Sequence, residues 1–308
     1  MLTHHQLELI KATVPILQQH GVALTSCMYS RMLRDNPELR QVFNQGHQRT
    51  GRQQASLAAA VLAYAQNIEN PIVMFKAVTH IASKHVSLGI RAEHYSIVGY
   101  HLIEAIKEVL GLTDEDELVE AWTIAYEQLA GILIDAETKL YQTMANIDGG
   151  WSGWRSFKIV EKKQETSNAV SFVLRPVDGG EICTILPGQF ISVRVYVKSE
   201  ELIQPRQYTV VSSDGYSIRI CVKRIDPKDD EPGGMVSTAL YYDYNVGDLI
   251  DLAPPMGEYY LDPSDTPAVL IIGGIGITTA VAMLGSVNAE ERNMHLYFVC
   301  HDQKDFAL

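Results

Sequence analysis

The periodicity of apolar residues changes twice along this chain, and each change marks a different kind of secondary structure. Before residue 148 apolar side chains recur every three or four positions, which predicts amphipathic helices. After the glycine-rich segment 148–150 the period becomes two, most clearly in Ser217–Val222, which predicts short strands. From Thr266 onward a continuous apolar run, Ala268–Ile272, is followed by a glycine-rich turn. The pattern therefore predicts three regions of different architecture.

Three apolar stripes carry the helical prediction for the first region. Their members, one helix at a time, are Val78, Ile81, Ala82 and His85; Tyr95, Val98, Leu102 and Ile106; and Tyr126, Leu129, Leu133, Glu137 and Leu140. Helix-breaking residues separate the helices at Asn36-Pro37, at Asn70-Pro71, at Gly89 and at 111–114. We therefore expect an all-α domain over residues 1–147.

The second region predicts a small antiparallel β-barrel over residues 151–262. Its expected strands, separated by Pro, Gly and Asp turns, are 157–160, 170–174, 190–196, 207–211, 217–222 and 249–252. Closing so few short strands into a barrel removes exposed sheet edges.

The third region, residues 266–308, predicts one βαβ unit that begins an α/β domain. A buried strand leads into Gly273–Thr278, then into a helix over Thr279–Val287 and a second strand over His295–Cys300. A single unit of this kind cannot bury both faces of its sheet, so we expect this domain to be incomplete in the chain.

Charge and cysteine usage narrow the function classes. The formal net charge of −12 argues against a nucleic-acid partner, which would need a basic face. The four cysteines are scattered without a CxxC pair, which argues against a disulfide framework or a zinc knuckle. No signal peptide is evident, and the most apolar stretch, 268–284, is too short and too interrupted to span a bilayer. We expect a cytoplasmic protein without stable membrane insertion.

Three polar residues lie on apolar helix stripes: His85, Tyr95 and Glu137. A lone histidine there could simply bond a carbonyl in the core. Burying a carboxylate without a partner is costly, however, and a His–Tyr–Glu chain would satisfy all three groups. If the His85 imidazole bound iron, hydrogen bonds from this His–Tyr–Glu series would make it more electron-donating. Tyr29 lies on an earlier helix, in the order that a small polar pocket opposite such an iron would require.

Longer stretches carry a family resemblance. LTSCMYSRMLRDNPELRQVFNQGHQRTGRQQASL (24–57) and HIASKHVSLGIRAEHYSIVG (80–99) resemble the globin domain of bacterial flavohaemoglobins, which are nitric oxide dioxygenases. The likeness continues through GGWSGWRSF, PGQFISV, RQYT and GGMVS to GGIGIT, and so covers essentially the whole chain.

The resemblance implies roles for the globin residues. His85 matches the proximal ligand of haem iron and Tyr29 the distal tyrosine that donates to bound O₂, while Tyr95 and Glu137 match the proximal relay. The remaining matches are Gln53 and Leu57 in the distal pocket, Phe43 as the ring that wedges the haem, and Lys84 at the haem–flavin interface.

The barrel contains a flavin motif of the ferredoxin-reductase type. Arg206 can grip a pyrophosphate, Tyr208 can stack on the flavin and Thr209 can bond it near N5, with Gln207 between them. A strand with an outward Arg and Tyr is the alternative for this motif alone. Glycines before a short helix, 236–241, favour a phosphate at its N-terminus. The candidate phosphate-binding residues at the start of this helix are Gly234, Val236 and Ser237. Separately, Phe190 matches the aromatic residue that the family has near the flavin.

The turn after the third region's first strand suits a nicotinamide dinucleotide pyrophosphate. Gly274, Gly276 and Thr278 are the residues that the resemblance places there. The family usually has Thr-Pro-Met after the glycines, whereas this chain has Thr278-Thr279-Ala280. The family also continues beyond position 308 with segments next to the nicotinamide and flavin.

The resemblance thus implies an enzyme that oxidises NO to nitrate with O₂ on a haem b reduced by NAD(P)H through FAD. The alternative is a truncated haem and FAD protein that binds O₂ or NO with little NAD(P)H-driven turnover. A plain ferredoxin-type reductase would leave the globin residues unexplained. We expect O₂ and NO as the small-molecule partners, a monomer, and no protein partner.

Overall fold

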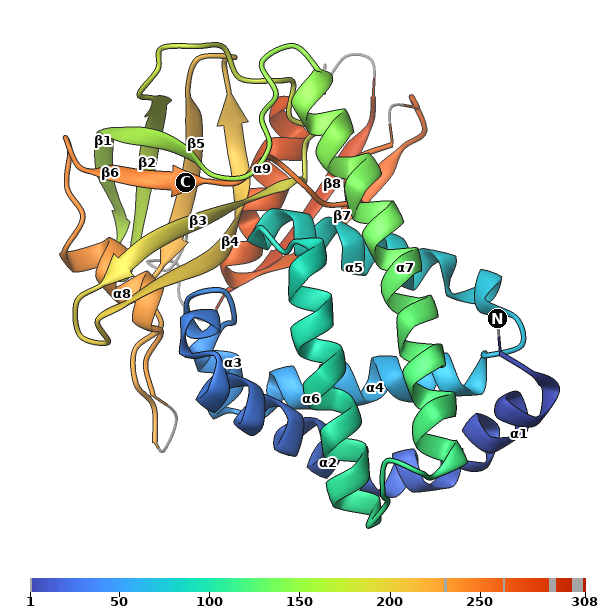
Figure 1. Cartoon of the computed structure of the whole chain (residues 1–308). Helices are drawn as coiled ribbons and strands as arrows, with labels where there is room; N and C mark the ends of the chain where they lie inside the picture. Colours follow the sequence, from blue (N-terminus) through green and yellow to red (C-terminus); the bar gives the residue numbers. More distant parts are fainter. Residues whose placement is uncertain (1, 230–231, 263, 288–291, 301–306) are drawn as a thin grey trace. The chain divides into compact units, whose positions relative to one another are not determined.

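The computed structural model describes residues 2–229, 232–262, 264–287, 292–300 and 307–308 (Figure 1). The chain divides into two compact units. The first comprises Met1–His85 with Ile90–Leu140, and the second comprises Val86–Gly89 with Tyr141–Leu308.

The first unit is helical, as the sequence predicts. Its elements are α1 (His4–Ala12), α2 (Val14–Asp35), η1 (Pro37–Gln41), α3 (Gln45–Arg49), α4 (Arg52–Gln66), η2 (Pro71–Met74), α5 (Phe75–Leu88), α6 (Ala92–Leu110) and α7 (Glu117–Asn146). Local chemistry sets their ends: Thr3 and Gln6 form a capping box on α1, and Gly111 ends α6 with a left-handed φ of 68°.

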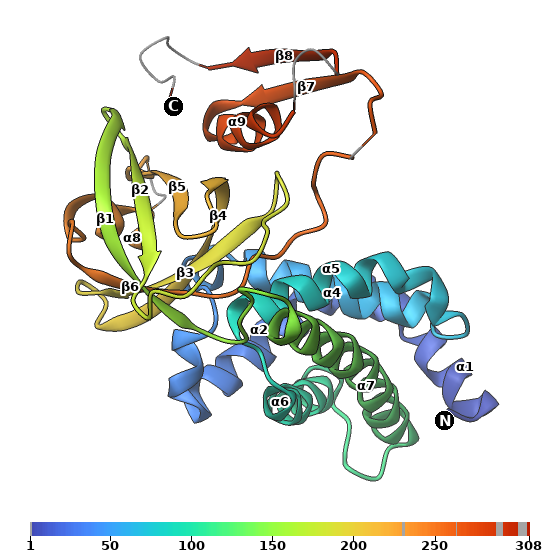
Figure 2. The ribbon, with the colours of Figure 1, turned by 90° about the horizontal axis from the view of Figure 1, so that it is seen from above.

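The core of the helical unit lies where α2 crosses its neighbours. Met28 and Met32 of α2 are fully buried and share a cluster with Leu102 and Ile106 of α6 and with Trp122 of α7. α6 and α7 run beside each other in both views (Figures 1 and 2). This packing brings the apolar stripes of the later helices to one interior.

The second unit contains a closed antiparallel barrel, which confirms the predicted architecture. Its strands are β1 (Arg155–Thr166), β2 (Ala169–Pro176), β3 (Phe190–Val197), β4 (Leu202–Ser213), β5 (Ile218–Lys223) and β6 (Leu249–Leu252). They pair in the order β1-β2-β5-β4-β3-β6, and β6 returns to β1. Several strands are longer than the sequence pattern predicts, because their polar ends continue the ladder.

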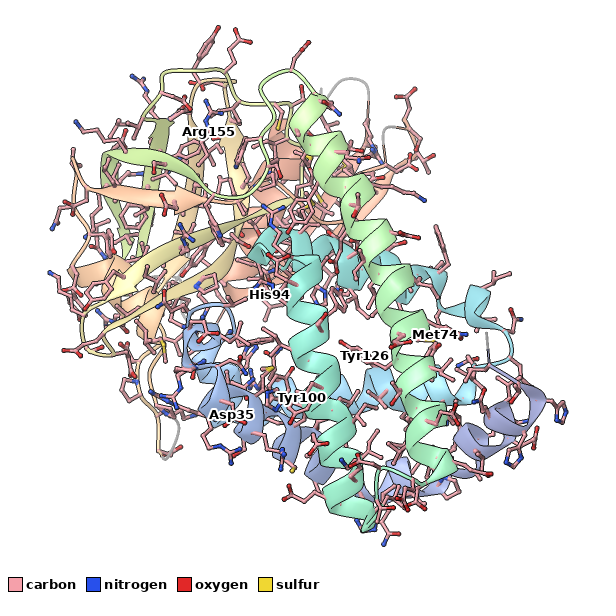
Figure 3. All side chains as sticks on the ribbon, viewed as in Figure 1. Asp35, Met74, His94, Tyr100, Tyr126 and Arg155 are labelled. Carbon is pink, nitrogen blue, oxygen red and sulfur yellow. The ribbon has the colours of Figure 1, made fainter. Side chains whose placement is uncertain are left out.

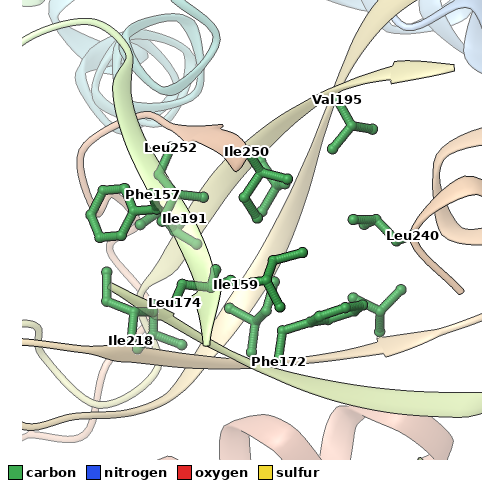
Figure 4. Packing of buried hydrophobic residues seen from close by; sticks show 14 of the residues in the cluster. Phe157, Ile159, Phe172, Leu174, Ile191, Val195, Ile218, Leu240, Ile250 and Leu252 are labelled. Atoms are coloured by element: carbon green, nitrogen blue, oxygen red, sulfur yellow. The ribbon is translucent and has the colours of Figure 1, made fainter. Parts of the chain in front are cut away.

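Alternating residues of the strands fill the barrel interior (Figure 4). Phe157, Phe172 and Ile191 are completely buried there. Helix α8 (Met235–Tyr242) contributes Leu240 to the same cluster. The barrel core therefore holds α8 directly against the strands.

The predicted βαβ unit follows the barrel: β7 (Ala268–Gly273), η3 (Gly274–Gly276), α9 (Ile277–Gly285) and β8 (Met294–Val299). β7 and β8 pair in parallel, and α9 lies on one face of them (Figure 2). On the other face Val269 is 58% and Ile271 76% exposed. One side of this sheet is thus bare, as expected for a single unit.

No helix in the described part of the chain combines the length and apolar character that crossing a bilayer would need.

Candidate functional site

The three polar residues from the apolar stripes converge in the helical unit. His85 Nδ1 lies 2.8 Å from Glu137 Oε1 and 3.0 Å from Tyr95 Oη. The Tyr95 hydroxyl also donates to Glu137 Oε1. Glu137 is 2% exposed, so these two donors replace the water that its carboxylate loses on burial. Three helices, α5, α6 and α7, each supply one member.

This arrangement fits a haem-iron ligand. A carboxylate on Nδ1 favours the tautomer that carries its proton there, which leaves the Nε2 lone pair available. Nowhere in the described ranges does a protein group bond Nε2 of His85. His85 would therefore hold iron through Nε2, with Glu137 and Tyr95 fixing its ring.

A second tyrosine supports this cluster. Tyr126 of α7 donates its hydroxyl to the backbone oxygen of Tyr95 at 2.6 Å, and lies between α6 and α7 (Figure 3). A Cβ at Gly99 would come within 2.4 Å of the Tyr126 ring, so only glycine leaves room for it. Neither Tyr126 nor Gly99 was predicted from the sequence to belong to the site. Tyr126 could have been predicted, because its hydroxyl lies on the same apolar stripe as Glu137.

The distal candidates also meet. Tyr29 is 5% exposed, its hydroxyl bonds Gln53, and its ring meets that of Phe43 edge-on with centroids 5.7 Å apart. Burial raises the pKa of Tyr29 to about 12, so the hydroxyl keeps its proton and can donate. Leu57 packs against the same core.

Lys84 is exposed on α5, one position before His85. Its role at a haem–flavin interface stays a prediction.

In the barrel unit, Arg206 is the group best suited to an anion. Its Nη1 donates to the oxygen of Pro205 at 2.6 Å and to Gln204 Oε1 at 3.4 Å. Over the described residues no carboxylate pairs with it. Desolvation of this half-buried guanidinium lowers the pKa of Arg206 to about 10. A pyrophosphate would supply the missing charge.

The other flavin candidates of the barrel lie on β4, the strand of Arg206, and on its neighbour β3. Phe190 of β3 pairs in register with Thr209 of β4, and Tyr208 packs against the barrel core. Burial raises the pKa of Tyr208, so its hydroxyl stays neutral. The Thr209 hydroxyl lies 3.5 Å from that of Thr279 on α9. Gln207 is exposed on the same strand.

At the start of α8, backbone groups rather than side chains are available to bind a phosphate. Ser237 Oγ donates to the Gly234 oxygen at 3.0 Å and accepts from the Ile225 N–H at 3.3 Å, so its hydroxyl is engaged. Val236 is 1% exposed in the barrel core. A Cβ at Gly234 would lie 2.5 Å from Ser237 Oγ. These residues could therefore hold a phosphate through the N–H groups of the first turn.

The glycine-rich turn after β7 forms as predicted. Gly274 has a φ of 51°, and a Cβ at Gly276 would meet Ile272 at 3.1 Å. The Thr278 hydroxyl donates to the Ile275 oxygen at 3.0 Å, so it closes the turn. Backbone groups of the turn could bind a ligand, while the Thr278 hydroxyl bonds within the turn.

Comparison with known proteins covers both the helical unit and the barrel. Residues 26–133 match the Globin family and residues 154–260 the Oxidoreductase FAD-binding domain family. A crystal structure of a flavohemoglobin from Malassezia yamatoensis, which has bound FAD and heme, superposes with a TM-score of 0.88 at 31% identity. The superposition covers 100% of this chain and 79% of that one. The fold and sites define an oxidoreductase that combines haem and FAD.

Two curated relatives identify the family. A flavohemoprotein of Bordetella pertussis is 51% identical over 302 residues, which are 97% of this chain and 74% of that protein. A flavohemoprotein of Chromobacterium violaceum is 49% identical over 289 residues, which are 93% of this chain and 72% of that protein. The chain belongs to the flavohemoprotein family.

Proposed function

We propose that this chain oxidises nitric oxide to nitrate with O₂, using electrons from NAD(P)H. The observation that carries the proposal is the pairing of two polar arrangements in one helical unit. Glu137 and Tyr95 bond His85 in the first arrangement, and Tyr29 bonds Gln53 in the second. A globin that only stores O₂ has no need of a carboxylate that increases electron donation by its histidine.

Each of these residues has a defined task. Bound haem would supply an iron for O₂, and bound FAD would supply hydride and electron-transfer chemistry. Tyr29 keeps its hydroxyl proton and donates a hydrogen bond into the pocket, oriented by Gln53. Glu137 accepts from His85 and Tyr95 and so keeps the imidazole in one tautomer. Arg206 binds the pyrophosphate of FAD.

A second candidate function is binding of O₂ or NO with slow nicotinamide-driven turnover. It is favoured by the bare face of β7 and β8, where Val269 and Ile271 are exposed. Hydride transfer needs the nicotinamide held about 3–3.5 Å from the flavin. The described residues of this region offer only the turn at Gly274–Gly276 and α9.

The test is NO consumption by the haem- and FAD-loaded chain, with nitrate measured as product. With dithionite-reduced protein, one equivalent of O₂-loaded haem should convert NO to nitrate. With NADH alone, continuous consumption supports the enzyme, and haem that stays oxidised supports the binding protein. Release of nitrous oxide or nitrite in place of nitrate would contradict the dioxygenase proposal.

A further inference from the structure

The last turn of α8 is held by a lysine from the barrel wall. Lys162 of β1 donates from Nζ to the backbone oxygens of Tyr241 at 2.7 Å and Tyr244 at 2.8 Å. Tyr241 lies in the last turn of α8, where intrahelical donors run out, and Tyr244 lies two residues beyond the helix end. The ammonium thus caps the C-terminus of the same helix whose N-terminus carries Gly234 and Ser237.

The ammonium that makes these bonds is partly withdrawn from water. Desolvation lowers the pKa of Lys162, while the carboxylates of Asp243 and Asp248 act on it in the opposite direction. The Nζ lies 5.8 Å from the Phe172 ring centre, and no ion pair with a carboxylate forms within the described residues. The cost of removing this charge from water is therefore offset mainly by the carbonyls of α8.

Two tyrosines fix the same end of α8 to the barrel. Tyr241 Oη donates to the Ser167 oxygen at 2.8 Å, and Tyr244 Oη donates to the Tyr196 oxygen at 3.1 Å. At the other end the Gly234 N–H donates to the Ile225 oxygen at 2.9 Å. The helix is thus anchored at both ends, and the N–H groups of its first turn have no acceptor within the helix itself.

We propose that Lys162 is a positioning residue for the diphosphate of FAD, acting through α8 without touching the cofactor. The inference rests on the proposed flavin site. A cation at the C-terminus and an anion at the N-terminus lie at opposite ends of one helix dipole, and each stabilises the helical state. With Lys162 in place, α8 is ordered before FAD arrives, so binding does not have to order it.

The test compares two flavins in the full chain. FAD carries the diphosphate and riboflavin lacks any phosphate, so only FAD contacts α8 through that group. In Lys162→Met the stem of the side chain remains and the ammonium is gone. We expect the Kd for FAD to rise about tenfold, because part of the binding free energy must then order α8. The Kd for riboflavin should stay within about twofold.

The matched control is Lys158→Met, which removes an exposed lysine from the same strand. It should leave both flavin affinities unchanged. Lys162→Gln gives a second variant if the methionine variant does not fold, since its amide keeps two donors while losing the charge. The ratio of the FAD Kd to the riboflavin Kd should rise there as well.

Two results would overturn the proposal. Equal weakening of FAD and riboflavin would show that Lys162 only supports the barrel, and an unchanged FAD affinity would show that α8 does not need it. Failure of the unaltered chain to bind FAD at all would instead reject the proposed flavin site. Far-ultraviolet circular dichroism and haem content of each variant confirm that the chain is folded.

Discussion

The hydroxyl of Thr25 on α2 donates to the backbone oxygen of Gln54 on α4 at 2.9 Å, across a buried helix crossing. Thr25 is 1% exposed. Tyr29 lies one turn further along α2, and Gln53 is the neighbour of Gln54. The same hydroxyl also lies 3.1 Å from the Gly21 oxygen of its own helix, so the bond to Gln54 is one of the contacts that join the two helices carrying the distal pair.

Replacing Thr25 with valine should lower the free energy of unfolding of the helical unit by about 1 kcal/mol, because one buried hydrogen bond is lost without a change of shape. Urea unfolding followed by circular dichroism measures it. Thr123→Val is the control, since the Thr123 hydroxyl on α7 bonds the Val119 oxygen of its own helix. An equal decrease in the free energy of unfolding of both variants would mean that the bond between α2 and α4 stabilises the protein no more than a bond within one helix.

Tyr29→Phe should speed O₂ dissociation from the haem-loaded protein about tenfold or more, since the donor to the ligand is removed. Stopped-flow displacement of O₂ by CO measures the rate. Tyr64→Phe is the matched control: Tyr64 is equally buried, lies on α4, and has a pKa raised by burial to about 12. Its removal should leave the rate unchanged. If both variants release O₂ at the rate of the unaltered protein, Tyr29 does not face the ligand.

The same burial predicts how the helical unit responds to alkali. The pKa of Tyr64 rises from 10.0 to about 12 on folding, so the folded state keeps a proton that the unfolded state releases. This stability is fully present below about pH 10 and is lost as the pH rises through about 12. Unfolding free energies measured between pH 8 and pH 11.5 should fall more steeply in the unaltered chain than in Tyr64→Phe. Parallel curves would show that Tyr64 titrates normally.

Glu137→Gln tests the proximal cluster without changing its shape. The variant should still bind haem, because His85 keeps its Nε2, but the imidazole should donate fewer electrons. We expect a lower iron–histidine stretching frequency by resonance Raman spectroscopy and a higher haem reduction potential. Glu127→Gln, an exposed change on the same helix, should alter neither. An unchanged stretching frequency in Glu137→Gln would remove the carboxylate from any electronic role.

Features of the fold and site could be predicted where the sequence pattern of a single helix or strand determines them. The helices and strands followed from apolar periodicity, and His85, Tyr95 and Glu137 could be grouped because each is a polar residue on an apolar stripe. Tyr126 shared that stripe, yet its role depends on Gly99 of another helix, which leaves space for its ring. No periodicity in one helix shows the space available on another.

The hydroxyl residues beside the glycines show the same limit. Ser237 and Thr278 stand at motif positions that suggest a ligand, but their hydroxyls bond the Gly234 and Ile275 oxygens of their own turns. Lys162 gave no signal at all, since a lysine in a strand normally faces water. Its capping role arises only when the barrel closes and brings the end of α8 beside β1.

Arg206→Ala should abolish FAD binding and leave haem binding unchanged. The guanidinium has no carboxylate partner among the residues described here, and desolvation lowers its pKa to about 10. Removing it therefore eliminates the charge for the diphosphate without breaking an ion pair, so the barrel should keep its stability.

The measurement is flavin and haem content of the purified Arg206→Ala chain after reconstitution with both cofactors. Arg175→Ala, an exposed change on β2, serves as the control and should retain both cofactors. Loss of both cofactors from Arg206→Ala would indicate unfolding, and retention of both would place the diphosphate elsewhere on the barrel.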